Sequence, residues 1–254
     1  MRRLLIRPGA IGDCIMSLPA LESARADYTE VWAPRVVLPL IRFADHSRAI
    51  ADTGLDLVGV VDSARVPALE AFDSIYSWYG TNRTEFREAV RHLPFTFFPA
   101  LPPNERGIPR IAVPETPVEN FAVIHPFASS PKKTWPLENF RALAQRLDIP
   151  VKWCAGPEEP LGDAVRIESL YDLGCWLATA RVYIGNDSGI AHLAAAVGTP
   201  VVSIFLSTDP RIWAPRGPHV VVLRNPTVDE AWKSVRTLVV SSSARTPSAR
   251  ISSP

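Results

Sequence analysis

Short apolar segments alternate along this chain with segments whose apolar residues recur at helical spacing. In the first half, strands are predicted at residues 4–6, 30–33, 57–61 and 74–77, and helices at 14–24, 35–44 and 83–92. In the second half, strands are predicted at 121–124, 151–154, 181–184, 201–205 and 220–223, and helices at 137–147, 172–179, 190–197 and 228–239. Strands that alternate with helices form parallel sheets covered on both faces. The pattern therefore predicts an α/β fold.

A proline-rich stretch at residues 94–117 separates the two halves and predicts a linker. We expect two Rossmann-like domains, 1–110 and 111–240, that face each other across a cleft. The tail at 241–254 is rich in Ser, Pro and Arg and is predicted to be disordered. Parallel sheets of this kind bind ligands at the carboxyl ends of their strands, so the loops after the strands are the places to search.

Composition and charge exclude several other classes of protein. The 27 basic and 26 acidic side chains nearly cancel, which argues against a general electrostatic grip on nucleic acid. The 3 cysteines form no C-x-x-C, so a disulfide scaffold and a zinc ribbon are both disfavoured. The 5 histidines show no H-x-x-x-H spacing, and no metal site is predicted.

The N-terminal segment resembles a signal peptide only briefly, because Arg7, Asp13 and a Pro-Gly pair interrupt its apolar run. No stretch approaches the roughly 18 apolar residues of a membrane span. The expected location is therefore the cytoplasm.

The first motif follows the first strand and reads R-P-G-A-I-G-D from Arg7 to Asp13. Gly9 and Gly12 allow a tight turn and a close approach to a ligand. Asp13 begins the next helix, where a carboxylate can simply cap free N–H groups. The turn is not the G-x-G-x-x-G fingerprint of dinucleotide binding, which disfavours NAD.

The second motif runs from His125 to Pro136 and leads into a helix. Ser129, Ser130 and Lys133, with the loop amides, suit a phosphate or diphosphate group. An ordinary solvated loop with a lysine pair is the alternative interpretation.

The third motif, G-N-D-S-G-I-A-H, runs from Gly185 to His192 and is the most specific of the three. Asp187 or Ser188 can cap the helix, and Gly189 leaves the start of the helix bare for a ligand. His192 lies one turn further along the same helix face. Alone it could be an ordinary buried histidine. The four residues crowded at one helix end predict a binding site.

At this point the sequence resembles glycosyltransferase family 9, the ADP-heptose:lipopolysaccharide heptosyltransferase family. The resemblance rests on D-S-G-x-x-H-L-A-A-A-x-G-x-P from Asp187, on R-x-G-A-x-G-D-x-x-x-S-x-P from Arg7, and on K-x-W-P from Lys133. It implies a GT-B fold and an inverting, metal-independent transfer of a heptose or related sugar from a nucleotide diphosphate, with no cofactor.

The resemblance also assigns roles to residues. Asp13 would be the general base. Gly9 and Gly12 of the first motif would belong to the donor-binding residues. Lys133, the two serines of the second motif and the helix start at Ser188 and Gly189 would stabilise the leaving diphosphate.

In the donor-binding half of the family pattern, Asp187 would contact sugar hydroxyls, and His192 would lie near the phosphates or the sugar. A glutamate after the second strand of the second half would hold the ribose. Here Glu158 and Glu159 both stand at that place, and the alignment leaves the choice open.

The implied partners are a nucleotide-sugar donor and a saccharide or lipid-linked saccharide acceptor, with a peripheral contact at the inner membrane and no nucleic acid. Two alternatives stay open: a non-catalytic nucleotide-sugar binding relative, and a nucleotide-sugar epimerase of the same architecture. The chain is shorter than usual for the family, and the segment from Gly156 to about Leu170 is expected to be too short for a full crossover helix.

Overall fold

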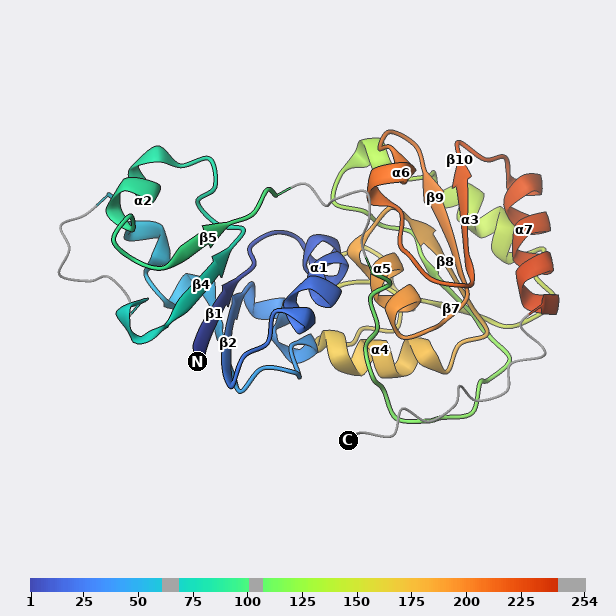
Figure 1. The fold of residues 1–254 in the computed structure, drawn as a ribbon. Coiled ribbons are helices and arrows are strands. Elements are labelled where there is room, and N and C mark those ends of the chain that lie inside the picture. Colours follow the sequence, from blue (N-terminus) through green and yellow to red (C-terminus); the bar gives the residue numbers. More distant parts are fainter. Residues whose placement is uncertain (61–68, 101–106, 242–254) are drawn as a thin grey trace. The chain divides into compact units, whose positions relative to one another are not determined.

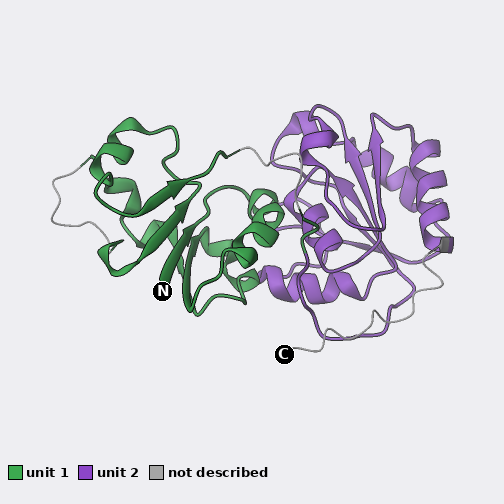
Figure 2. Ribbon diagram, viewed as in Figure 1, with its two compact units in different colours: residues 1–109 green, residues 110–254 purple. Residues whose placement is uncertain are grey.

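The computed structural model describes residues 1–60, 69–100 and 107–241. The chain divides into two compact units, Met1–Pro109 and Arg110–Pro254 (Figures 1 and 2). Each unit holds one five-stranded sheet. All strand pairs in both sheets are parallel, as the alternation of strands and helices predicts.

The sheet of the first unit has the strand order β3-β2-β1-β4-β5. Its strands are β1 (Arg2–Ile6), β2 (Tyr28–Ala33), β3 (His46–Ala49), β4 (Ser74–Ser77) and β5 (Phe95–Phe97). The α-helices are α1 (Ile11–Ser23) and α2 (Thr84–Ala89). Leu4 and Ile6 of β1 pack on one face with Leu55, Leu69 and Phe86. The order places β1 between β2 and β4, so the chain reverses its direction of travel across the sheet beside β1.

The structure differs from the predictions for the first half at four places. The predicted strand 57–61 is wrong in its described part, because residues 55–57 form a short 3₁₀ helix and residues 58–60 a turn. Gly54 and Gly59 adopt positive φ, +70° and +80°, which ends an extended segment. The predicted α-helix 35–44 is instead a 3₁₀ helix, Arg35–Leu40, which contains Pro39. Pro39 has no backbone N–H to donate, and the helix ends one residue later, at Leu40.

The other two corrections concern strands that local patterns do not mark. Strand β3 has a largely polar sequence, and its pairing with β2 defines it. Strand β5 lies inside the predicted linker 94–117, and it pairs with β4. Phe95 and Phe97 pack against the same core as Phe86, with ring centroids 5.8 and 6.3 Å from that ring. Residues 101–106 of the predicted linker lie outside the described residues.

The sheet of the second unit has the order β10-β9-β8-β6-β7. Its strands are β6 (Ala122–His125), β7 (Val151–Trp153), β8 (Val182–Asn186), β9 (Val201–Phe205) and β10 (Val220–Arg224). Its α-helices are α3 (Leu137–Ala144), α4 (Leu170–Ala178), α5 (Gly189–Ala196), α6 (Pro210–Trp213) and α7 (Val228–Ser241). Apart from the short α6, these are the elements that the periodicity predicts. The predicted tail from residue 242 onward lies outside the described residues.

Helices cover both faces of the second sheet (Figure 1). Ile124, Ile184 and Ile204 point to one face and pack with residues of α3 and α7. Helices α4 and α5 pack against each other, where the Gly174 position lies close to Val197. No helix lies between β7 and α4, so residues 154–169 form a loop, as the short spacing predicts. In this sheet the direction reverses between β6 and β8.

Candidate active site

The points at which the strand order reverses in the two sheets coincide with the sequence motifs. In each sheet the strand order reverses at the first strand of the unit, and open α/β sheets bind ligands in the crevice at this place. The Arg7–Asp13 motif follows β1, between β2 and β4. The second and third motifs follow β6 and β8, which are neighbours. The fold therefore brings the second and third motifs together at one edge of the second sheet.

In the first unit, the loop after β1 folds back on Asp13. Gly9 has a φ of +119°, and a Cβ there would lie 3.0 Å from Oδ2 of Asp13. That same oxygen accepts a hydrogen bond from the Ala10 amide at 3.0 Å. Asp13 thus makes the helix-start contact that the sequence offered as an alternative role. The other carboxylate oxygen makes no hydrogen bond within the described residues.

Arg7 holds the loop after β1 through hydrogen bonds. It was not among the predicted site residues. Its guanidinium is buried, donates to Ser17 Oγ at 2.7 Å and to the Asp13 carbonyl at 3.1 Å, and also contacts the Pro8 carbonyl. Ser17 Oγ donates to the same Asp13 carbonyl at 2.8 Å. Burial lowers the pKa of Arg7. A charged residue directly after a buried strand is the signal that could have identified it.

Cys14 follows Asp13 in the first turn of α1. The side chain is buried, and burial raises the pKa of its thiol to about 11.

In the second unit, Lys133 and Asp187 form an ion pair. Lys133 Nζ lies 2.8 Å from Oδ2 of Asp187, whose side chain is only 6% exposed, against 27% for the lysine. Thr208 Oγ1, after β9, donates to the same oxygen at 2.6 Å. Thr208 was not a predicted site residue, although it lies three residues after the end of β9. The three residues come from three loops that converge at the carboxyl edge of the sheet.

The two serines of the second motif differ in their surroundings. Ser130 Oγ caps the short turn Pro131–Lys133 by accepting from the Lys132 amide at 3.3 Å. Ser129 is exposed and makes no hydrogen bond within the described residues.

Asn186, the last residue of β8, forms hydrogen bonds at both ends of the loop 127–134. It accepts from the Trp135 amide at 2.9 Å and donates to the Pro126 carbonyl at 2.8 Å.

The start of helix α5 carries free backbone donors. Ser188 occupies the N-cap position, but its hydroxyl makes no capping hydrogen bond. Within the described residues, the amides of Gly189 and Ile190 donate to no protein group. Unpaired amides at a helix start bind anions. His192 is buried one turn further along.

The structure separates Glu158 from Glu159. Glu158 is exposed, whereas Glu159 is half-buried and accepts two hydrogen bonds on Oε2. The donors are the Gly156 amide at 2.6 Å and His125 Nε2 at 3.1 Å. Oε1 makes no hydrogen bond within the described part of the chain. Partial burial acts to raise the pKa of Glu159, but the bonds from His125 and Gly156 outweigh it, and the pKa lies below its usual value.

Arg166 holds the backbone of this loop. Its guanidinium donates to the carbonyl of Glu159 at 2.8 Å and to that of Leu161 at 2.6 Å, and it contacts the carbonyl of Gly156. Neither His125 nor Arg166 was predicted as a site residue. His125, at the end of β6, and Arg166, in the loop after β7, each contact Glu159, so no local pattern marks either residue.

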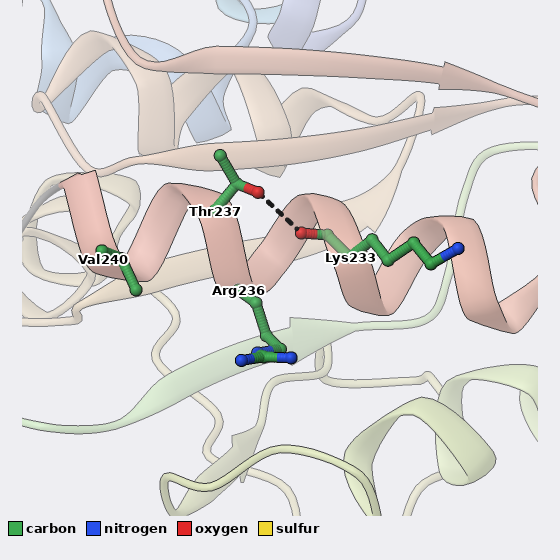
Figure 3. Close-up of a pocket in the computed structure, with 4 residues that line it drawn as sticks. All are labelled: Lys233, Arg236, Thr237 and Val240. Carbon is green, nitrogen blue, oxygen red and sulfur yellow. Dashed lines mark hydrogen bonds between the residues drawn. The ribbon is translucent and has the colours of Figure 1, made fainter.

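A separate open pocket lies on the surface of α7, lined by Lys233, Arg236, Thr237 and Val240 (Figure 3). All four residues come from one helix, and Thr237 Oγ1 donates to the Lys233 carbonyl at 3.0 Å. Helix α7 packs along a face of the sheet. None of the predicted site residues lines this pocket.

Two further searches of the described ranges bear on function. Within residues 1–60, 69–100 and 107–241, no group of three or more His, Cys, Asp or Glu side chains is placed to hold a metal ion. No helix in these ranges has the length and apolarity to cross a membrane.

Comparisons with known proteins identify the family of the chain. The model of glycosyltransferase family 9 (heptosyltransferase) matches residues 110–239, just over half of the chain. Lipopolysaccharide heptosyltransferase 3 of Escherichia coli is 30% identical over 38% of this chain and 34% of that protein. The same protein of strain K12 is 30% identical over 41% and 36%. The match thus spans about a third of the length of these curated relatives.

Solved structures share the fold over nearly the whole chain. E. coli ADP-heptose LPS heptosyltransferase II superposes with a TM-score of 0.73 at 16% identity, over 96% of this chain and 100% of that one. E. coli heptosyltransferase WaaC with ADP gives 0.67 at 16%, over 94% and 100%. These likenesses confirm the expected GT-B-like α/β fold. Because the family model covers more than half of the sequence, this chain belongs to glycosyltransferase family 9, the heptosyltransferase family.

Proposed function

We propose that this protein transfers a heptose, or a related sugar, from ADP-heptose to a saccharide of the lipopolysaccharide core. The observation that carries the proposal is the meeting of Lys133, Asp187 and the bare start of α5 at the reversal point of the second sheet. A cation and free amides at one place suit a diphosphate. Family membership and the names of the E. coli relatives support heptose as the sugar and ADP as its carrier.

In this proposal the second unit binds the donor. Lys133, Ser129, Ser130 and the amides of Gly189 and Ile190 stabilise the charge that builds up on the leaving diphosphate. Asp187 accepts from sugar hydroxyls, and His192 lies beside the phosphates or the sugar.

Glu159 holds the ribose. Its Oε2 is fixed by two donors, which leaves Oε1 to accept from a ribose hydroxyl. We assign the ribose to Glu159 and not to Glu158. Glu158 is exposed, so its side chain would lose more conformational entropy when it became ordered on binding.

The first unit supplies the base. Asp13 takes the proton from the acceptor hydroxyl while that oxygen attacks the anomeric carbon and the bond to the diphosphate breaks. Attack opposite the leaving group inverts the anomeric centre. No metal is needed in this scheme, since a lysine and helix amides carry the charge stabilisation. Gly9, with a φ of +119°, allows the loop to turn beside the Asp13 carboxylate, whereas Gly12 lies inside α1.

A peripheral contact with the inner membrane is part of the proposal, because a lipid-linked acceptor lies there. The side chains of Arg2 and Arg3 already contact other groups of the protein, so we do not assign the membrane contact to them. The Arg2 guanidinium lies 4.2 Å from the Tyr28 ring centroid, and Arg3 donates to the Ala24 carbonyl at 2.8 Å. Sedimentation with vesicles that contain anionic lipid tests this contact.

The first experiment is a thermal-shift panel with ADP, UDP, GDP, CMP and NAD, followed by titration of the best ligand. Ligands that bind only the native state raise its stability, by about 2.7 kcal/mol at a hundredfold excess over Kd. We expect a selective shift with ADP. A shift with UDP or GDP alone would move the donor away from ADP-heptose, and no shift with any nucleotide would overturn the donor site.

Transfer itself is measured with ADP-heptose and a truncated lipopolysaccharide acceptor, with and without EDTA. The expected product has the inverted anomeric configuration by NMR, and EDTA leaves the rate unchanged. A rate that disappears with EDTA and returns with a divalent cation would contradict the metal-free scheme.

A second candidate function, a non-catalytic nucleotide-sugar binding relative, is favoured by one observation. The Ala10–Asp13 contact gives Asp13 a structural role without catalysis. In that case the protein would bind ADP and ADP-heptose but release no ADP in the presence of an acceptor.

A further inference from the structure

Asn186 connects three segments of the second unit through one buried side chain. The residue ends β8 and has no exposed surface. Its Oδ1 accepts from the Trp135 amide at 2.9 Å, and its Nδ2 donates to the Pro126 carbonyl at 2.8 Å. Pro126 and Trp135 stand immediately before and after the loop 127–134. A single amide side chain therefore closes this loop at both ends.

Asparagine suits this position because it carries a donor and an acceptor at the end of a short side chain. An aspartate would keep the acceptor for Trp135 but would set a carboxylate against the Pro126 carbonyl. An alanine would leave both backbone groups without their present partner in a buried place.

Further contacts make the downstream end of the loop a firm anchor. The Trp135 ring is buried, donates from Nε1 to the Pro226 carbonyl at 3.2 Å, and packs edge-on against Phe140 at 4.9 Å. The upstream end continues directly from β6. The residue after Asn186 is Asp187, which pairs with Lys133 near the downstream end of the loop. Two consecutive residues at the end of β8 thus hold the loop at three points.

We propose that Asn186 is a positioning residue that keeps the loop 127–134 in the shape that receives the donor diphosphate. It acts through Lys133, Ser129, Ser130 and the loop amides, and does not touch the substrate. A loop ordered before binding loses less conformational entropy when the ligand arrives, which raises affinity. This inference rests on the proposed function, since it assumes that a nucleoside diphosphate binds at this loop.

The test compares ADP with adenosine by isothermal titration in wild type, Asn186→Asp and Asn186→Ala. We expect the affinity for ADP to fall about tenfold or more in both variants, which is the size of effect of one lost buried hydrogen bond. The affinity for adenosine, which lacks the phosphates, should change less than about threefold. Circular dichroism and melting curves show that each variant is folded, and Asn186→Asp, which changes no side-chain volume, is the variant to use if Asn186→Ala does not fold.

Thr199→Val is the matched control. Thr199 is buried in the same unit, precedes β9 at the opposite edge of the sheet, and donates to the Leu177 carbonyl at 2.8 Å. Its loss should lower stability without changing the ratio of ADP to adenosine affinity. Hydrogen exchange adds a readout that needs no ligand. In Asn186→Asp, the amides of residues 127–135 should exchange faster than in wild type. In Thr199→Val, the same amides should exchange at the wild-type rate.

If wild type binds ADP and both Asn186 variants keep the same ratio of ADP to adenosine affinity, the positioning role of Asn186 is overturned. The proposed function would stand in that case. Equal losses for ADP and adenosine, as from a general loss of structure, would also overturn the positioning role. A wild-type protein that binds no nucleoside diphosphate would overturn the proposed function, and with it the purpose assigned to Asn186.

Discussion

The Lys133 ammonium lies 2.8 Å from Oδ2 of Asp187, although the two residues belong to loops that follow different strands. The lysine is more exposed than its partner, so a bound phosphate can share it while Thr208 still donates to the aspartate. A charge-assisted contact of this kind contributes more to binding than a neutral hydrogen bond. The pair therefore links the loop after β6 to the loop after β8 and holds the Lys133 ammonium at the proposed diphosphate site.

Replacing Lys133 should weaken ADP binding selectively. In Lys133→Ala we expect the Kd for ADP to rise about tenfold to a hundredfold, since a hydrogen bond to a charged group contributes about 1.5–3 kcal/mol. Adenosine binding should be unchanged by titration calorimetry. Lys132→Ala, a neighbouring exposed lysine, is the control and should behave as wild type. An equal loss for ADP and adenosine would remove Lys133 from the phosphate site.

Glu159 and its neighbour form a second matched pair of variants. Glu159→Gln should weaken adenosine binding and reduce the preference for adenosine over 2′,3′-dideoxyadenosine, because the carboxylate accepts from the ribose hydroxyls. Glu158→Gln should change neither value. Should Glu158→Gln abolish the preference while Glu159→Gln keeps it, the ribose contact would belong to the exposed residue.

The same carboxylate predicts a pH dependence of stability. Hydrogen bonds from His125 and Gly156 outweigh the effect of burial and place the pKa of Glu159 below its usual 4.5. A lowered pKa stabilises the fold above the unfolded-state pKa, and this contribution is lost as the pH falls through the folded-state value. The difference in unfolding free energy between wild type and Glu159→Gln, from urea titrations, should be largest near neutral pH and shrink below pH 4.5. A difference that grows toward acid pH would contradict the assignment.

Asp13→Asn separates the catalytic role of Asp13 from its helix-start contact. An asparagine oxygen can still accept from the Ala10 amide but is no base. We expect the transfer rate to fall about a hundredfold or more, which is typical of a lost general base. The melting temperature and the Kd for ADP should stay close to wild type. Unchanged transfer would leave Asp13 with a structural role only.

The cysteines should differ in reactivity toward iodoacetamide. Cys14 and Cys154 are buried, and burial raises the pKa of their thiols to about 11 and about 12. Cys175, on α4, is only partly buried. At pH 8 the native protein should be modified at Cys175 first, as measured by peptide mass spectrometry, and at all three positions in guanidinium chloride. Early modification of Cys14 would show that the loop after β1 opens in solution.

Much of the fold could be predicted because its signals are local. The apolar runs of β1, β6 and β9 and the helical spacing of α3 and α7 mark those elements without knowledge of their neighbours. The polar strand β3 and the proline-flanked β5 carry no such signal, because only pairing with β2 and β4 makes them strands. The candidate site divides in the same way. The motif residues Asp13, Lys133 and Asp187 are visible as residue types after strands, whereas His125 and Thr208 gain their importance only from side chains distant in sequence.

The sequence by itself determined the α/β class, the two halves and the three strand-end motifs, because backbone periodicity and turn residues act over a few positions. The tertiary structure decided the strand order, which sets β6 beside β8 and β1 beside β4. It also decided that Glu159 pairs with His125 while Glu158 faces solvent, and that Asn186 closes the loop 127–134. These choices depend on hydrogen bonds between segments tens of residues apart, and such bonds form only when the whole sheet is assembled.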